Sequence, residues 1–128
     1  MDDKKERKNL MSIFKNPQQN PNHSTVMDIP VDEVQESKDQ LFLVDVRRPD
    51  ELTGELGHIQ GVKHIVLDEL PQKIDELPKD QTIVFVCRSG ARSGHATEFA
   101  KESGFSEVYN MLGGMIAWNE KNYPVEKE

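Results

Sequence analysis

The pattern of apolar and polar residues divides the chain into blocks that predict alternating strands and helices. The strongest strand signal is residues 82–86, an apolar run without polar alternation, which is typical of a strand covered on both faces. The predicted strands are residues 25–29, 40–46, 62–66, 82–86 and 107–111, and the predicted helices are residues 30–37, 50–56, 67–77, 93–103 and 115–122. This order predicts an α/β fold with a central parallel five-stranded sheet and helices on both of its faces.

Chain length and local composition predict one domain with two short extensions. A chain of 128 residues is long enough for a single domain with a substantial core. Residues 1–24 combine charges with asparagine, proline and glutamine, so we expect a flexible N-terminal arm there. The folded domain is expected at residues 25–124, and residues 125–128 form a C-terminal tail.

Composition narrows the classes of function. The net charge is −7 and the mean hydropathy is −0.69, which predicts a soluble protein without a membrane span and argues against nonspecific binding of nucleic acid. One cysteine excludes an internal disulfide and fits a reducing cytoplasm, so we expect a cytoplasmic location. No two histidines stand at metal-ligand spacing with a third ligand nearby, which predicts no metal site.

The candidate chemistry lies where the strongest strand ends. Cys87 follows that strand directly, and the next residues are small or cationic, with Gly90 between Arg88 and Arg92. The N-terminus of the following helix, the two cations and inward-facing N–H groups beside a left-handed glycine would all favour a thiolate and hold a small anion. A lone cysteine after an apolar strand is otherwise a small buried hydrophobe. The number of cations and glycines in this loop favours the functional interpretation.

Polar residues at the end of the strand at 40–46 are candidates to support the loop. For Asp45, two interpretations are equally open: it accepts hydrogen bonds from loop N–H groups, or it is an ordinary strand-end cap. For Arg47, a simple ion pair with Glu51 is the favoured interpretation. His58 is expected to bond the backbone rather than to act as a base. Ser93 is expected to cap the helix that follows the loop.

Four short motifs in order resemble one known family. They are residues 43–47, 57–62, 87–93 and 113–118, and they are similar to the Asp-Val-Arg, Gly-His-Ile-x-Gly-Ala, active-site-loop and Gly-Gly-x-x-x-Trp signatures of single-domain rhodaneses. Only Val62 departs, where the family usually has alanine. The resemblance implies a rhodanese-like fold and a sulfurtransferase in which Cys87 is the nucleophile. The residues that it implies for substrate binding are Arg88, Ser89, Gly90, Ala91, Arg92 and Ser93, and those that it implies for support are Asp45, Arg47 and His58.

The resemblance also implies substrates and partners, and two other classes of function are alternatives to it. The expected substrates are thiosulfate or a persulfide as sulfur donor and a thiol or cyanide as acceptor, with a protein as a further acceptor and no cofactor. One alternative is a noncatalytic interaction module that keeps the fold. Another is a phosphatase or arsenate reductase, but those loops place an arginine six positions after the cysteine, where this chain has Ser93.

Overall fold

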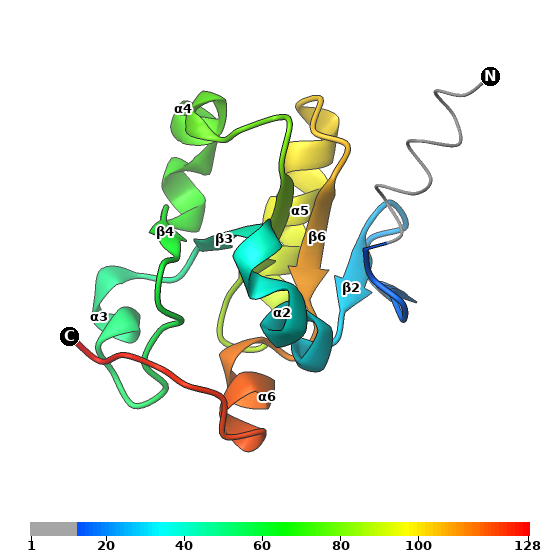
Figure 1. Cartoon of the computed structure of the whole chain (residues 1–128). Coiled ribbons are helices and arrows are strands. Elements are labelled where there is room, and N and C mark those ends of the chain that lie inside the picture. The colour runs from blue at the N-terminus through cyan, green and yellow to red at the C-terminus, as the bar shows by residue number, and fades with distance from the viewer. Residues whose placement is uncertain (1–12) are drawn as a thin grey trace.

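The computed structural model of the chain describes residues 13–128. Within them, a six-stranded sheet has the order β1-β2-β6-β5-β3-β4 (Figure 1). The strands are β1 (Gln18–Gln19), β2 (Met27–Ile29), β3 (Leu41–Asp45), β4 (Lys63–His64), β5 (Thr82–Val86) and β6 (Val108–Met111). All neighbouring strands are parallel except β1 and β2, which are antiparallel. The predicted α/β fold is therefore confirmed, with one antiparallel edge strand more than the five parallel strands expected.

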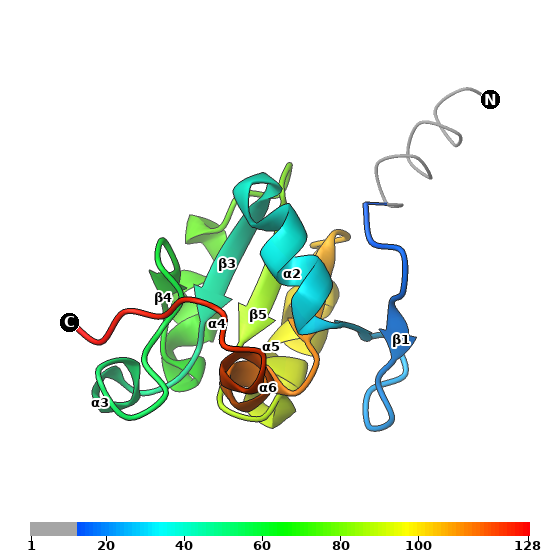
Figure 2. The same cartoon turned by 60° about the horizontal axis from the view of Figure 1, so that its bottom comes forward.

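Helices cover both faces of the sheet, as predicted (Figures 1 and 2). They are α2 (Val31–Ser37), α3 (Pro49–Leu52), α4 (Leu70–Lys73), α5 (Ala91–Glu102) and α6 (Gly114–Glu120), with short 3-10 turns η1 (Lys38–Gln40), η2 (Leu67–Glu69) and η3 (Ile74–Glu76). The single helix expected at residues 67–77 is instead η2, α4 and η3 in succession. None of the helices over residues 13–128 is both long enough and apolar enough to cross a membrane.

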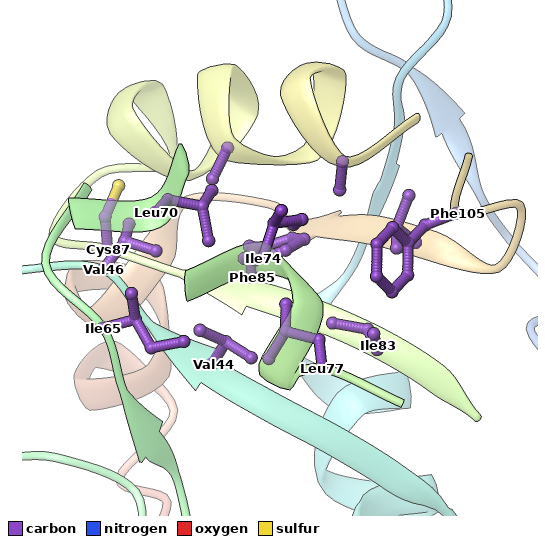
Figure 3. Packing of buried hydrophobic residues seen from close by; sticks show 13 residues of the cluster. Val44, Val46, Ile65, Leu70, Ile74, Leu77, Ile83, Phe85, Cys87 and Phe105 are labelled. Atoms are coloured by element: carbon purple, nitrogen blue, oxygen red, sulfur yellow. The ribbon is translucent and has the colours of Figure 1, made fainter. Parts of the chain in front are cut away.

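Strand β5 lies in the middle of the sheet and divides the core into two clusters. Ile83 and Phe85 point to the face that α4 and α5 cover, whereas Val84 and Val86 point to the face of α2 and α6. Both sides of the strand are thus buried, as its unbroken apolar run predicts. Cys87 continues the first face, and in Figure 3 its sulfur lies at the rim of that cluster, near the start of α5.

The N-terminal arm expected over residues 1–24 needs a correction. Residues 1–12 lie outside the described residues, but residues 13–24 pack on the edge of the sheet, where β1 pairs with β2. Phe14 is only 5% exposed and contacts the ring of Tyr109 edge to face. The side-chain amide of Gln19 donates to several backbone carbonyls, among them that of Val26. Polar side chains therefore organise a segment whose composition alone indicates disorder.

Candidate active site

The sulfur of Cys87 is surrounded by hydrogen-bond donors from the following loop. The backbone N–H of Gly90 donates to Sγ at 3.1 Å and the backbone N–H of Ser93 at 3.3 Å. The hydroxyl of Ser93 lies 3.2 Å from the same sulfur. Cys87 as a residue is 1% exposed. A sulfur withdrawn from water but faced by two backbone N–H donors is an environment suited to negative charge.

The local fold aims these donors at the sulfur. Gly90 has φ 101°, a left-handed conformation that a residue with a Cβ rarely adopts, and it is the N-cap of α5. Because α5 begins at Ala91, its first N–H groups have no partner within the helix and face the loop. Ser93 lies inside the first turn, so the prediction that it caps the helix was wrong. Its hydroxyl is thereby free to contact the sulfur.

A buried polar network that no pattern in the sequence indicates extends from the Ser93 hydroxyl. The side-chain amide of Asn110 on β6 donates to Oδ1 of Asp28 at 2.9 Å and to the carbonyl of Gly90 at 3.1 Å. Both partners only accept, so the amide oxygen of Asn110 must face the Ser93 hydroxyl, with which it forms a hydrogen bond. Asp28 and Asn110 are buried, and Asn20 also donates to Asp28.

The turn before α6 holds the loop from the other side. The backbone N–H of Met115 donates to the carbonyl of Cys87 at 2.8 Å, and that of Ile116 donates to the carbonyl of Arg88 at 3.0 Å. Gly114 has φ 59°, and a Cβ built there would overlap with the carbonyls of Cys87 and Arg88. The pair Gly113–Gly114 therefore lets the start of α6 approach the backbone of the loop closely.

The two arginines of the loop differ in their surroundings. Arg92 forms a two-pronged ion pair with Glu51, with Nη1–Oε1 at 2.7 Å and Nη2–Oε2 at 2.9 Å. The hydrogen bonds from Arg92 lower the pKa of Glu51 from 4.5 to about 2, although partial burial acts in the opposite direction. Arg88 is exposed. Arg92 is therefore already paired, whereas the sequence-based interpretation took both arginines as cations available to the loop.

The residues expected to support the loop from β3 make a separate buried ion pair. Arg47 donates through Nη2 to Asp45 at 2.8 Å and to the carbonyl of Gly57 at 2.7 Å. Both side chains are about fully buried. Asp45 accepts from the N–H of Arg47 and not from the loop at residues 87–93, and the carboxylate of Glu51 pairs with Arg92. The expected loop contact of Asp45 and the expected Arg47–Glu51 ion pair were therefore wrong.

His58 lies away from the sulfur. Its Nδ1 is 2.9 Å from the carbonyl of Leu52, and its backbone pairs with that of Glu126 in the C-terminal segment. His64 likewise bonds the carbonyl of Arg47 at 2.7 Å. The prediction that His58 bonds the backbone is confirmed.

Three potential metal ligands meet beside the loop. His23, from the segment before β2, lies against His95 and Glu98 of α5, and one ligand atom of each lies within 4.8 Å of the others. The prediction of no metal was based on spacing along the chain. That reason does not hold in the folded protein, because the fold brings the distant His23 to α5.

The loop lines only small hollows. One hollow, of about 230 Å³, is bordered by Ser89, Gly90 and Ala91 together with Asn110. A second, of about 220 Å³, lies between Gly90, Ala91 and the N-terminal segment. Another hollow, of about 450 Å³, has no lining residue from the loop. The surroundings of the sulfur therefore fit a small ligand.

The chain is similar to known proteins over most of its length. A family model described as a rhodanese-like domain matches residues 30–121. A protein of Allochromatium vinosum named sulfurtransferase is 36% identical over 87 residues, which are 68% of this chain and 79% of that protein. Thiosulfate sulfurtransferase GlpE of Vibrio cholerae is 29% identical over 104 residues, which are 81% and 96% of the two chains.

A solved structure extends the likeness to three dimensions. The crystal structure of a rhodanese-related protein from Thermoplasma volcanium has a TM-score of 0.74 and 32% sequence identity, and the match covers 79% of this chain and 98% of that one. The chain, with its single cysteine in the loop after the central strand, belongs to the rhodanese-like domain family.

Proposed function

We propose that the protein is a sulfurtransferase that carries sulfane sulfur as a persulfide of Cys87. The observation that supports this most is the environment of the Cys87 sulfur. Cys87 follows the central strand directly, and its sulfur faces two backbone N–H groups and one hydroxyl. A family relative named thiosulfate sulfurtransferase supports thiosulfate as the donor. Small hollows beside the loop favour a donor of that size.

The reaction has two displacements at sulfur. In the first, the Cys87 thiolate attacks the outer sulfur of thiosulfate, a sulfur–sulfur bond forms, and sulfite leaves with the electron pair of the broken bond. In the second, cyanide or a thiolate attacks the outer sulfur of the persulfide, and the Cys87 thiolate leaves. Both steps transfer sulfur between anions, so no proton transfer and no cofactor is required.

Different loop residues stabilise the negative charge of the sulfur and attract the anionic donor. The backbone at Gly90 and Ser93 stabilises the Cys87 sulfur, and the exposed Arg88 attracts the anionic donor. Ser89 and Ala91 border the hollow through which the donor enters. The charge of Arg92 is paired with Glu51, so this side chain mainly shapes the entrance to the loop.

The source of the acceptor follows from the cysteine count. The chain has one cysteine, so no second thiol of the same chain resolves the persulfide. The sulfur therefore leaves on an external thiol, on cyanide or on an acceptor protein. A lone nucleophilic thiol also fits a reducing compartment, which keeps a cytoplasmic location as part of this proposal.

One assay separates this function from the alternatives. Formation of thiocyanate from thiosulfate and cyanide is measured beside hydrolysis of an aryl phosphate, for the wild type and Cys87→Ser. The proposal requires thiocyanate formation that depends on Cys87 and no phosphate hydrolysis. Phosphate hydrolysis without thiocyanate indicates a phosphatase, and absence of both activities indicates a noncatalytic module.

A further inference from the structure

We propose that His23, His95 and Glu98 form a binding site for one divalent transition-metal ion, with zinc as the best match. Two imidazoles and one carboxylate are a ligand set that zinc uses in proteins, and three protein ligands leave a fourth position for water or another ligand. This inference does not depend on the proposed sulfur transfer, because none of the three residues contacts the sulfur of Cys87.

The ligand atoms lie near the separation that an ion requires. Nδ1 of His23 is 3.2 Å from Oε1 of Glu98, and the rings of His23 and His95 are 4.6 Å apart between centroids. Zinc bonds of about 2.0–2.2 Å in a tetrahedron place ligand atoms roughly 3.3–3.5 Å apart. Because His95 is exposed, its ring can turn without disturbing the core, and this movement closes the remaining distance.

Two of the ligands come from one face of α5. His95 and Glu98 are three residues apart in the helix, a spacing that puts side chains on the same face. Gly94 precedes them, and a Cβ at that position would lie 3.3 Å from Cδ2 of His23. A glycine inside the helix therefore gives the His23 ring room to lie against α5.

The third ligand, His23, is held in place by its own segment. The side-chain oxygen of Asn20 accepts hydrogen bonds from the backbone N–H groups of Asn22 and His23, at 2.8 and 3.0 Å. The carbonyl of His23 accepts from the N–H of Val26 and from the amide of Gln19. The His23 side chain is 10% exposed. Little freedom is lost when such a residue binds an ion, which favours binding.

The position of the site predicts what an ion would do. His23 and His95 border the same hollow as Gly90 and Ala91, at the start of α5. A bound ion would join residues 13–24 to the helix whose first turn holds the sulfur. By mass action, an ion that binds only the folded chain raises the free energy of unfolding.

Calorimetric titration of the untagged protein with zinc tests the proposal. We expect one zinc per chain, and we expect Cys87→Ser to bind zinc as tightly as the wild type, which separates this site from the thiol. His95→Ala and Glu98→Gln should each weaken binding at least about tenfold. Glu102→Gln, one turn further along α5 and exposed, is the matched control and should leave binding unchanged.

A second readout uses cobalt as a probe. The Co²⁺-loaded wild type should show visible d–d bands and no thiolate charge-transfer band, and His95→Ala should lose the visible bands while its circular dichroism shows an intact fold. Zinc should raise the thermal midpoint of the wild type and not that of His95→Ala. Absence of saturable binding, or binding lost in Cys87→Ser and kept in His95→Ala, would overturn the proposal.

Discussion

Replacement of Ser93 by alanine tests the network behind the sulfur. The hydroxyl of Ser93 contacts Sγ of Cys87 at 3.2 Å and also bonds the amide oxygen of Asn110. The other two polar positions of that amide are fixed by Asp28 and Gly90. The amide therefore cannot turn to find a new partner, and the substitution leaves its buried oxygen without a donor.

The expected magnitude follows from that unpaired oxygen. A buried acceptor left unsatisfied costs about 1–3 kcal/mol, and Asn110 is almost fully buried, so we expect Ser93→Ala to lower the free energy of unfolding by about 2 kcal/mol. Urea unfolding followed by the fluorescence of Trp118, the only tryptophan of the chain and a buried one, measures this loss.

The control is Ser103 at the other end of α5, which lacks such a role. The hydroxyl of Ser103 donates to the carbonyl of Phe99, which also accepts the N–H of Ser103. That carbonyl stays paired in Ser103→Ala, so we expect a loss of only about 0.5 kcal/mol. In a Cys87→Ala background, the loss caused by Ser93→Ala should stay the same, because the single hydroxyl proton bonds Asn110 and not the sulfur. Equal losses for Ser93→Ala and Ser103→Ala, or a loss for Ser93→Ala that shrinks in the Cys87→Ala background, would refute this reasoning.

Three further substitutions test the elements around the loop. Gly114→Ala should lower the free energy of unfolding by more than about 2 kcal/mol, because the left-handed backbone and the overlap with loop carbonyls both resist a Cβ; a loss below about 1 kcal/mol in urea unfolding argues against this packing. Glu51→Gln should cost about 1 kcal/mol at pH 7, the magnitude of a partly exposed bidentate pair. Arg92 lowers the pKa of Glu51 from 4.5 to about 2, so this stabilisation is complete above pH 4.5 and is lost as pH falls through about 2. Urea unfolding at a series of pH values checks this. A difference in stability between Glu51→Gln and the wild type that stays constant over this pH range contradicts the assignment. Arg47→Met should lower the free energy of unfolding by about 3–5 kcal/mol, because it leaves the buried carboxylate of Asp45 without its ion-pair partner. Adding Asp45→Asn should restore part of that loss. A double variant no more stable than Arg47→Met would show that the ion pair is not the cause.

Local patterns predicted the parts of the fold and site that are contiguous in the chain. The unbroken apolar run of β5 indicated a doubly covered strand, and the glycine and arginines after Cys87 indicated a tight loop before a helix. Gly90 indeed has a positive φ and precedes α5 directly. These features depend on neighbours within a few residues, so their signal survives in the sequence alone.

Contacts between residues that are distant in the chain could not be predicted from such local patterns. Asn110 and Asp28 are 82 positions apart in the chain, and Arg92 and Glu51 are 41 positions apart. No local sequence pattern therefore indicates either contact. The sequence indicated Arg47 as the partner of Glu51 because the two are close in the chain, but Arg47 is buried against Asp45 instead. Side-chain direction at the strand end decides these pairings, and it depends on the packing of the whole sheet.

The N-terminal segment illustrates a second kind of limit. Its composition indicates disorder, because it offers few apolar side chains to bury. Asparagine and glutamine nevertheless fix residues 18–26 through bonds to backbone groups, and β1 extends the sheet. The same segment delivers His23 to α5, which no spacing rule along the chain detects.

The intact mass of the protein after incubation with thiosulfate shows whether Cys87 carries sulfur. We expect the wild type to become heavier by one sulfur atom, cyanide to remove this atom, and Cys87→Ser to gain nothing. A wild type that keeps its original mass, or a Cys87→Ser variant that gains the same atom, would contradict a sulfur carrier built on Cys87.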